Sequence, residues 1–185
     1  MKKIYLLLAD GFEEIEALTP VDVLRRLDLD VFMTSISGKL EVIGAHNIVV
    51  KCDVLIEDVN FDDASMIILP GGMPGTTNLF ENKLVKDAIT LLDGKSLPIA
   101  AICAAPMILG EMGLLVGRKA TSFPGFENHL KGAVKSDNLV EVDGHIITAK
   151  GMGAAMDFSL EIVKYLLGEE KMNEIGKAMI VEKYL

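Results

Sequence analysis

Short apolar runs alternate with longer stretches of helical periodicity along the chain. The apolar runs have the length of buried strands and are residues 4–9, 31–36, 65–70 and 98–102. Apolar side chains recur at helical spacing in residues 13–27, 84–92 and about 104–114. This alternation predicts βα units wound around a mostly parallel sheet, which is an α/β fold with helices on both faces.

The second half of the chain adds a hairpin and two helices to this pattern. Residues 139–142 and 145–149 flank an Asp-Gly turn, which predicts a β-hairpin, and a short strand is expected near Ala120. Residues 154–167 and 170–179 predict the closing helices. Residues 43–56 are rich in β-forming side chains, but their periodicity leaves the pairing open. Because no linker, repeat or low-complexity segment interrupts the pattern, we expect one domain over residues 1–185.

Composition and charge exclude several classes of ligand and location. The chain has 185 residues, 50% of them apolar, and a formal net charge of −9, which disfavours binding to a phosphate backbone. No apolar run is long enough to span a bilayer, so we expect a soluble, cytoplasmic protein without membrane partners. The two cysteines, Cys52 and Cys103, form no disulfide framework and suit a reducing compartment.

Cys103 is the most informative candidate for chemistry, because it stands between a predicted strand and the helical segment that follows. A turn of this nucleophile-elbow kind holds a side chain out of the sheet, and free backbone amides beside it favour an anion. The sequence therefore predicts a lowered thiol pKa and a reactive thiolate at Cys103. The alternative interpretation is a small buried apolar residue.

Three other residues are candidates for the same site. Glu16 has apolar neighbours and is the glutamate expected to point inward, where a buried, protonated carboxyl would donate a hydrogen bond to the sulfur. The amides of Gly72 and Ala104 are expected to form an oxyanion or anion pocket. On spacing alone, Glu16 could instead be an exposed helix residue, and Glu13 and Glu14 are interpreted as charges at the helix start.

Several motifs together resemble one family. They are residues 9–16 (ADGFEEIE), 19–26 (TPVDVLRR), 69–72 (LPGG), 100–104 (AAICA) and 151–153 (GMG). With these motifs the chain is identified as a member of the ThiJ/PfpI superfamily, in its DJ-one branch. The resemblance implies a flavodoxin-like, doubly wound sheet, a homodimer, a reactive Cys103, a protonated Glu16 and backbone contacts from Gly72 and Ala104. It also implies activity on reactive carbonyls or glycated groups, redox sensing, or chaperone activity under oxidative stress.

The chain departs from the family pattern at Phe123, which stands where many members of this branch have a histidine. Phenylalanine cannot transfer a proton, so turnover would lose a general acid/base worth roughly 10²–10⁴ in rate. His129 lies six residues further along and is considered a less favoured substitute. His46 and His145 have no metal-ligand spacing in the sequence, so no metal is predicted. Cys52 is interpreted as structural.

Two main hypotheses follow from these residues. In the first, the Cys103 thiolate adds to a small reactive carbonyl or glycated substrate, with Glu16 exchanging protons and water replacing the missing histidine. In the second, the protein is a redox-responsive binding protein or chaperone in which Cys103 is oxidised. A third, weaker hypothesis is an interaction domain with a vestigial pocket. No cofactor is predicted, because the glycines lack the spacing of dinucleotide or P-loop motifs.

Overall fold

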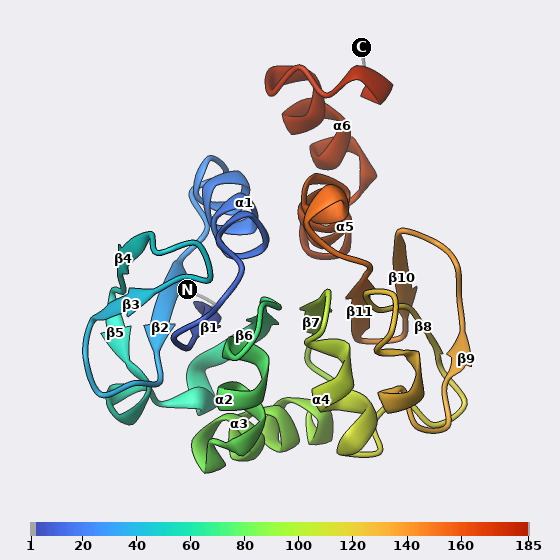
Figure 1. Ribbon diagram of the computed structural model, residues 1–185. Helices are drawn as coiled ribbons and strands as arrows, with labels where there is room; N and C mark the ends of the chain where they lie inside the picture. The colour runs from blue at the N-terminus through green and yellow to red at the C-terminus, as the bar shows by residue number, and fades with distance from the viewer. Residues whose placement is uncertain (1–2, 185) are drawn as a thin grey trace.

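The computed structural model describes residues 3–184 and is built around a seven-stranded sheet (Figure 1). Its strand order is β10-β11-β7-β6-β1-β2-β5, and all neighbours are parallel except the β10–β11 hairpin. The sheet strands are β1 (Lys3–Leu8), β2 (Val31–Ser35), β5 (Val54–Leu55), β6 (Ala64–Leu69), β7 (Ile99–Ile102), β10 (Val140–Asp143) and β11 (Ile146–Ala149). The predicted mostly parallel sheet is confirmed.

Helices cover both faces of the sheet, as Figure 1 shows. They are α1 (Glu14–Arg25), α2 (Gly75–Glu81), α3 (Lys83–Gly94), α4 (Pro106–Glu111), α5 (Ala155–Leu167) and α6 (Glu169–Ala178). The side chains of β1 alternate between two buried clusters: Leu6 packs in the cluster with α1, α5 and α6, and Leu7 packs in the cluster with α3 and α4. A strand buried on both faces is apolar throughout, which explains why β1 has no polar alternation.

Two short two-stranded ribbons extend from the main sheet. They are β3 (Glu41–Ile43) with β4 (Val49–Lys51), which is antiparallel, and β8 (Lys119–Ala120) with β9 (Val134–Lys135), which is parallel. The β3–β4 ribbon resolves the segment whose pairing the sequence left open. The ribbon lies against the start of α1, where the Ala45 amide donates a hydrogen bond to the Phe12 carbonyl (2.8 Å).

The helices following the apolar strands differ in how well the sequence predicts them. The helices α3, α5 and α6 agree with prediction to within two residues. The helix α2 was missed, because its sequence GTTNLFE lacks a long apolar periodicity. The predicted helix after Cys103 is shorter than expected and begins only at Pro106, after a turn.

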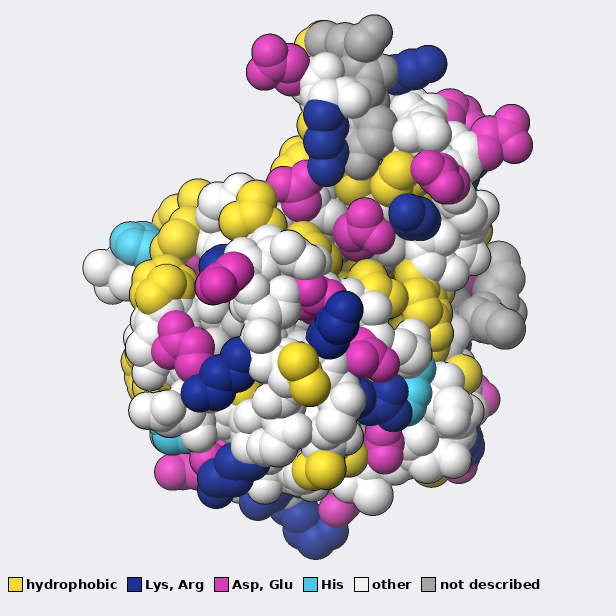
Figure 2. All heavy atoms as spheres, turned by 90° about the vertical axis from the view of Figure 1, so that its right-hand side faces the viewer, with side chains coloured by type: hydrophobic (Ala, Val, Ile, Leu, Met, Phe, Trp, Pro, Cys, Tyr) yellow, Lys and Arg dark blue, Asp and Glu magenta, His cyan; other side chains and the backbone are white. Residues whose placement is uncertain are grey.

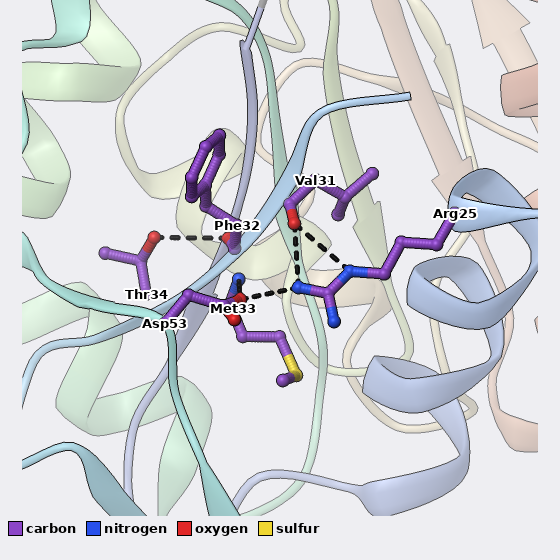
Figure 3. Close-up of polar contacts among 6 residues, drawn as sticks. All are labelled: Arg25, Val31, Phe32, Met33, Thr34 and Asp53. Atoms are coloured by element: carbon purple, nitrogen blue, oxygen red, sulfur yellow. Dashed lines mark hydrogen bonds and ion pairs between the residues drawn. The ribbon is translucent and has the colours of Figure 1, made fainter. Parts of the chain in front are cut away.

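Arg25, at the C-terminal end of α1, fixes this helix to the edge of the sheet (Figure 3). Its guanidinium donates to the Val31 carbonyl (2.8 Å from Nη2) and to Asp53 Oδ2 (2.6 Å). The same Asp53 oxygen accepts from the Met33 amide (2.8 Å). This network links α1, β2 and the turn before β5, and it holds in place the helix that carries Glu16.

Within residues 3–184, no helix combines the length and the apolar character that crossing a membrane would require.

Candidate active site

The ends of three adjacent strands bring the predicted site residues together. Glu16 follows β1, Gly71 and Gly72 follow β6, and Cys103 follows β7, and these strands are neighbours in the sheet. Because all three strands are parallel, their carboxyl ends meet at one edge. The chain reverses its direction of strand addition between β1 and β6, which is where doubly wound sheets form ligand sites.

Cys103 occupies a strained turn directly after β7. Its φ is +66°, which non-glycine residues seldom adopt, and only 8% of the residue is exposed. Two backbone hydrogen bonds hold it there: its amide donates to the Ala149 carbonyl (2.9 Å), and its carbonyl accepts from the Phe123 amide (2.8 Å). Strain of this kind persists only where the surrounding structure enforces it. The predicted elbow position is thus present.

Glu16 points inward, as predicted, and is fully buried. Its Oε2 accepts a hydrogen bond from the Gly71 amide (3.0 Å), and its carboxyl interacts with the Cys103 thiol. Its Oε1 has no hydrogen-bond partner among residues 3–184. A Cβ at position 71 would lie 2.5 Å from the Cys103 Cβ and 2.7 Å from Glu16 Oε2, so only glycine fits between the two groups.

The acid and the thiol change each other's ionisation. Burial raises the pKa of Glu16 to about 7, against the effect of hydrogen bonds from Cys103 and Gly71. Burial, together with the charge of Glu16, raises the pKa of the Cys103 thiol to about 12. The prediction of a lowered thiol pKa was therefore wrong for this arrangement, because it counted the amides and neglected burial and the neighbouring carboxylate.

The amides of Gly72 and Ala104 contact the sulfur, as predicted. Both hydrogen bonds lower the thiol pKa, although burial and Glu16 outweigh them. Gly72 has φ +88°, and a Cβ there would lie 2.4 Å from the Glu13 nitrogen, so the close approach of this backbone requires glycine. Two amides aimed at one atom are suited to an oxyanion or an oxidised sulfur.

Phe123 lies beside this pocket and is 36% exposed. A Cβ at Gly151 would lie 3.0 Å from Phe123 Cδ2 and 3.7 Å from Glu16 Oε1, which places the ring on the side of the carboxyl oxygen that lacks a partner. The ring has no atom that exchanges protons, so the described pocket contains no histidine at this point. His129 does not take its place, because its Nδ1 is paired with Glu111 Oε1 (2.9 Å).

Glu13 and Glu14 stand at the start of α1, as interpreted, and they have a further contact there. Both are buried, and the side chain of His46, on the turn between β3 and β4, lies against them. Glu14 Oε1 accepts from the His46 amide (2.8 Å), and Glu14 Oε2 lies 2.8 Å from His46 Nδ1. A metal ion would fit among the three side chains, whose ligand atoms lie within 4.8 Å of one another, but the ion pair already accounts for their proximity.

The remaining sequence candidates lie away from the thiol. The His145 side chain is mostly buried, and its Nε2 lies 2.8 Å from Asp93 Oδ1. Cys52 is a free, buried cysteine, and burial raises the pKa of its thiol to about 12. No signal in the sequence linked His46 to Glu14, which are 32 residues apart.

A doubly wound sheet with a buried carboxyl beside a strained, amide-bordered cysteine defines an α/β protein with a buried cysteine site at the switch point of its sheet. The model of the DJ-1/PfpI family matches residues 2–165, and the chain belongs to this family.

Relatives and solved structures agree with this assignment. Protein DJ-1 homolog B of Arabidopsis thaliana is 37% identical over 97% of this chain, which covers 42% of that protein. Deglycase TK1284 of Thermococcus kodakarensis is 33% identical over 89% of this chain and 99% of its own length. The structure of oxidized Toxoplasma gondii DJ-1 matches with a TM-score of 0.94 and 30% identity, covering 98% of this chain and 100% of that one.

The chain spans less than half the length of the two Arabidopsis relatives it matches, DJ-1 homologs B and A.

Proposed function

We propose that this protein acts on small reactive carbonyls or glycated groups through a Cys103 thiolate supported by Glu16. The observation that carries the proposal is the contact between the strained thiol and a fully buried carboxyl, with the Gly72 and Ala104 amides on the same sulfur. A relative covered over almost its full length is named a deglycase, which supports this class of substrate.

Glu16 and Cys103 form a pair that shares protons. Since the Glu16 pKa is about 7, a large fraction of this carboxyl holds its proton at neutral pH and no longer opposes the thiolate by charge. The reactive form is the state in which Glu16 keeps the proton and Cys103 is ionised. Its abundance is a property of the pair and not of the thiol alone.

In the first step, the thiolate adds to the carbonyl carbon. A carbon–sulfur bond forms, the carbonyl π electrons move to oxygen, and Glu16 gives its proton to that oxygen, leaving a hemithioacetal and a carboxylate. The amides of Gly72 and Ala104 stabilise the charge that develops on oxygen. Water must carry the later proton transfers that a histidine at position 123 would perform.

Methylglyoxal conversion to lactate tests this function. Wild type should release lactate slowly, and Cys103→Ser should release none above the uncatalysed rate. Phe123→His should raise the rate by about ten-fold or more, because a positioned general acid/base is worth roughly 10²–10⁴. Cys52→Ser is the matched control and should release lactate like wild type. Lactate release by Cys103→Ser above the uncatalysed rate would exclude this function.

A second candidate is redox sensing by oxidation of Cys103, and the absence of a proton donor in Phe123 favours it. Hydrogen peroxide would supply the oxidant: the thiolate attacks one peroxide oxygen, the O–O bond breaks and water leaves, and a second equivalent gives sulfinate. Mass spectrometry after peroxide treatment should find two added oxygens on Cys103 and none on buried Cys52. Equal oxidation of both cysteines would count against it.

A homodimer is part of the proposal. Exposed apolar side chains gather on α1 and the adjacent β3–β4 ribbon, namely Ile15, Ile43, Ile48 and Val49. Ile43 and Val49 are cross-strand partners, so they form one continuous apolar surface. Light scattering should give a dimer for wild type and a monomer for Ile48→Lys, whereas Val116→Lys, at an exposed position far along the chain, should remain dimeric.

A further inference from the structure

A cavity of about 260 Å³ lies next to the candidate site, between the β8–β9 ribbon and the loop that carries Phe123. Its walls include Thr121, Ser122, Glu127, Lys135, Asp137 and Lys150. Ser122 directly precedes Phe123, and Lys150 directly precedes Gly151, so the cavity shares two segments with the thiol pocket without containing Cys103. It is a separate space with polar walls.

The cavity walls hold hydrogen-bond donors that the described residues leave unused. The Thr121 side chain is buried, and its hydroxyl has no hydrogen-bond partner within residues 3–184. Ser122 is buried too, and its hydroxyl reaches only the Phe123 carbonyl, at 3.3 Å. The Thr121 oxygen is almost entirely shielded from solvent, so a molecule in the cavity does not contact it. The hydrogen bond of Ser122 is long, so its hydroxyl is the one available to a ligand.

Lys150 contributes a positive charge that is only partly neutralised. Its side chain is 29% exposed, and its ammonium forms no hydrogen bond with any residue in the described range. The nearest carboxylate is Asp137, whose Oδ1 lies 3.6 Å away on a fully exposed side chain. An ammonium has three donors, so Lys150 retains capacity for an acceptor inside the cavity.

The acidic residues of the cavity wall do not prevent Lys150 from binding an acceptor in the cavity. Glu127 Oε2 already accepts from the Gly125 amide (2.8 Å). Asp137 is solvated, which weakens its pairing with Lys150. Lys135, on the same wall, reaches only the Asn128 side chain, at 3.5 Å. Figure 2 shows that the surrounding face mixes acidic and basic side chains, so no broad field of one sign explains the lysines.

We propose that this cavity binds a small anion through a carboxylate or phosphate group, held by the Lys150 ammonium and the Ser122 hydroxyl. A water molecule occupies about 30 Å³ in the liquid, so the space corresponds to about nine waters. That volume admits inorganic phosphate or a short carboxylic acid. The proposal concerns binding alone and does not depend on the chemistry of Cys103.

Inorganic phosphate and acetate, titrated separately at constant ionic strength into the ¹⁵N-labelled full chain, test the site and distinguish the two chemistries. Saturable shifts should appear at the amides of Thr121, Ser122 and Ser136 with at least one of the two anions. Lys150→Met should weaken the affinity by about ten-fold or more, since hydrogen bonds to charged groups are the strong ones. Lys150→Arg should restore most of it.

Two further variants separate a built site from surface charge. Lys119→Met removes a lysine from the neighbouring strand β8 and should bind like wild type. Ser122→Ala removes the proposed hydroxyl donor and should weaken binding several-fold. Cys103→Ser should bind like wild type, so this result is independent of the proposed carbonyl chemistry.

Three outcomes would overturn the proposal: no saturable shift with either anion, an equal loss in Lys119→Met and Lys150→Met, or unchanged affinity in a folded Lys150→Met.

Discussion

Glu14 and Glu16 lie two residues apart at the start of α1, and both are buried, yet the pKa values of their carboxyl groups move in opposite directions. Burial raises the pKa of both groups. For Glu14, the hydrogen bonds and charge of His46 outweigh burial and lower the pKa below its usual value. For Glu16, hydrogen bonds from Gly71 and Cys103 are too weak to do so, and the pKa rises to about 7.

The difference teaches that burial and the hydrogen-bond partner together decide which carboxyl stays protonated, because Glu16 is the more deeply buried of the two and lacks a basic partner such as His46. Glu14 faces an imidazole that gains a proton readily, because Glu14 and Glu13 raise the pKa of His46. Glu16 faces a thiol that itself competes for a proton. One helix turn therefore carries a structural anion that anchors the β3–β4 ribbon and a neutral acid suited to proton transfer.

The largest expected effect is on the pH dependence of stability. In the folded state the pKa of Glu16 is raised from 4.5 to about 7. The contribution of this carboxyl to the free energy of unfolding is therefore complete below pH 4.5 and is lost as the pH rises through about 7. Wild type should lose about 3 kcal/mol of unfolding free energy over this window relative to Glu16→Gln. Urea unfolding at a series of pH values measures the difference.

Glu14→Gln is the matched control for this experiment. A lowered folded pKa contributes stability above the unfolded pKa and loses it as the pH falls, so the slope should have the opposite sign. Equal slopes in the two variants would show that the two carboxyls do not differ as described.

The next effect concerns the rate of Cys103 alkylation by iodoacetamide at neutral pH. Glu16→Gln removes the charge that raises the thiol pKa and retains a hydrogen-bond donor, so the rate should rise by about ten-fold for each unit by which the pKa falls. Glu16→Leu removes the donor and keeps the burial, so it should react more slowly than Glu16→Gln.

Glu14→Gln should alkylate at nearly the wild-type rate, because its partner is His46. If both glutamine variants accelerate alkylation equally, a general loosening of α1 explains the rate and the specific pairing of Glu16 with Cys103 is refuted.

The smallest effect is expected at His46. Glu14→Gln removes the hydrogen-bonded carboxylate that is the first cause of the raised imidazole pKa, so NMR titration should find a lower His46 pKa in this variant. An unchanged His46 pKa would mean that Glu14 does not hold this ribbon by charge.

The pattern of apolar runs sufficed to predict the sheet, the hairpin and most helices, because strands buried on both faces and long amphipathic helices leave strong periodic signals. The pattern missed α2, because seven residues are too few to show a clear helical periodicity. It also extended the predicted helix α4 into the turn at Cys103. The positions of Glu16, Gly72, Cys103 and Ala104 were predictable, because each follows a strand end that the alternation itself identifies.

The ionisation of the site was decided by the tertiary structure alone. The sequence placed Cys103 after β7 and left Glu16 either inward or exposed on α1. Only the packing of β1 against β6 and of β6 against β7 placed that carboxyl against the thiol, and its charge, with burial, outweighs the two amides. Likewise, His46 meets Glu14 only because the β3–β4 ribbon folds onto α1. Coulomb and desolvation energies depend on distances in space, which the order of residues does not contain.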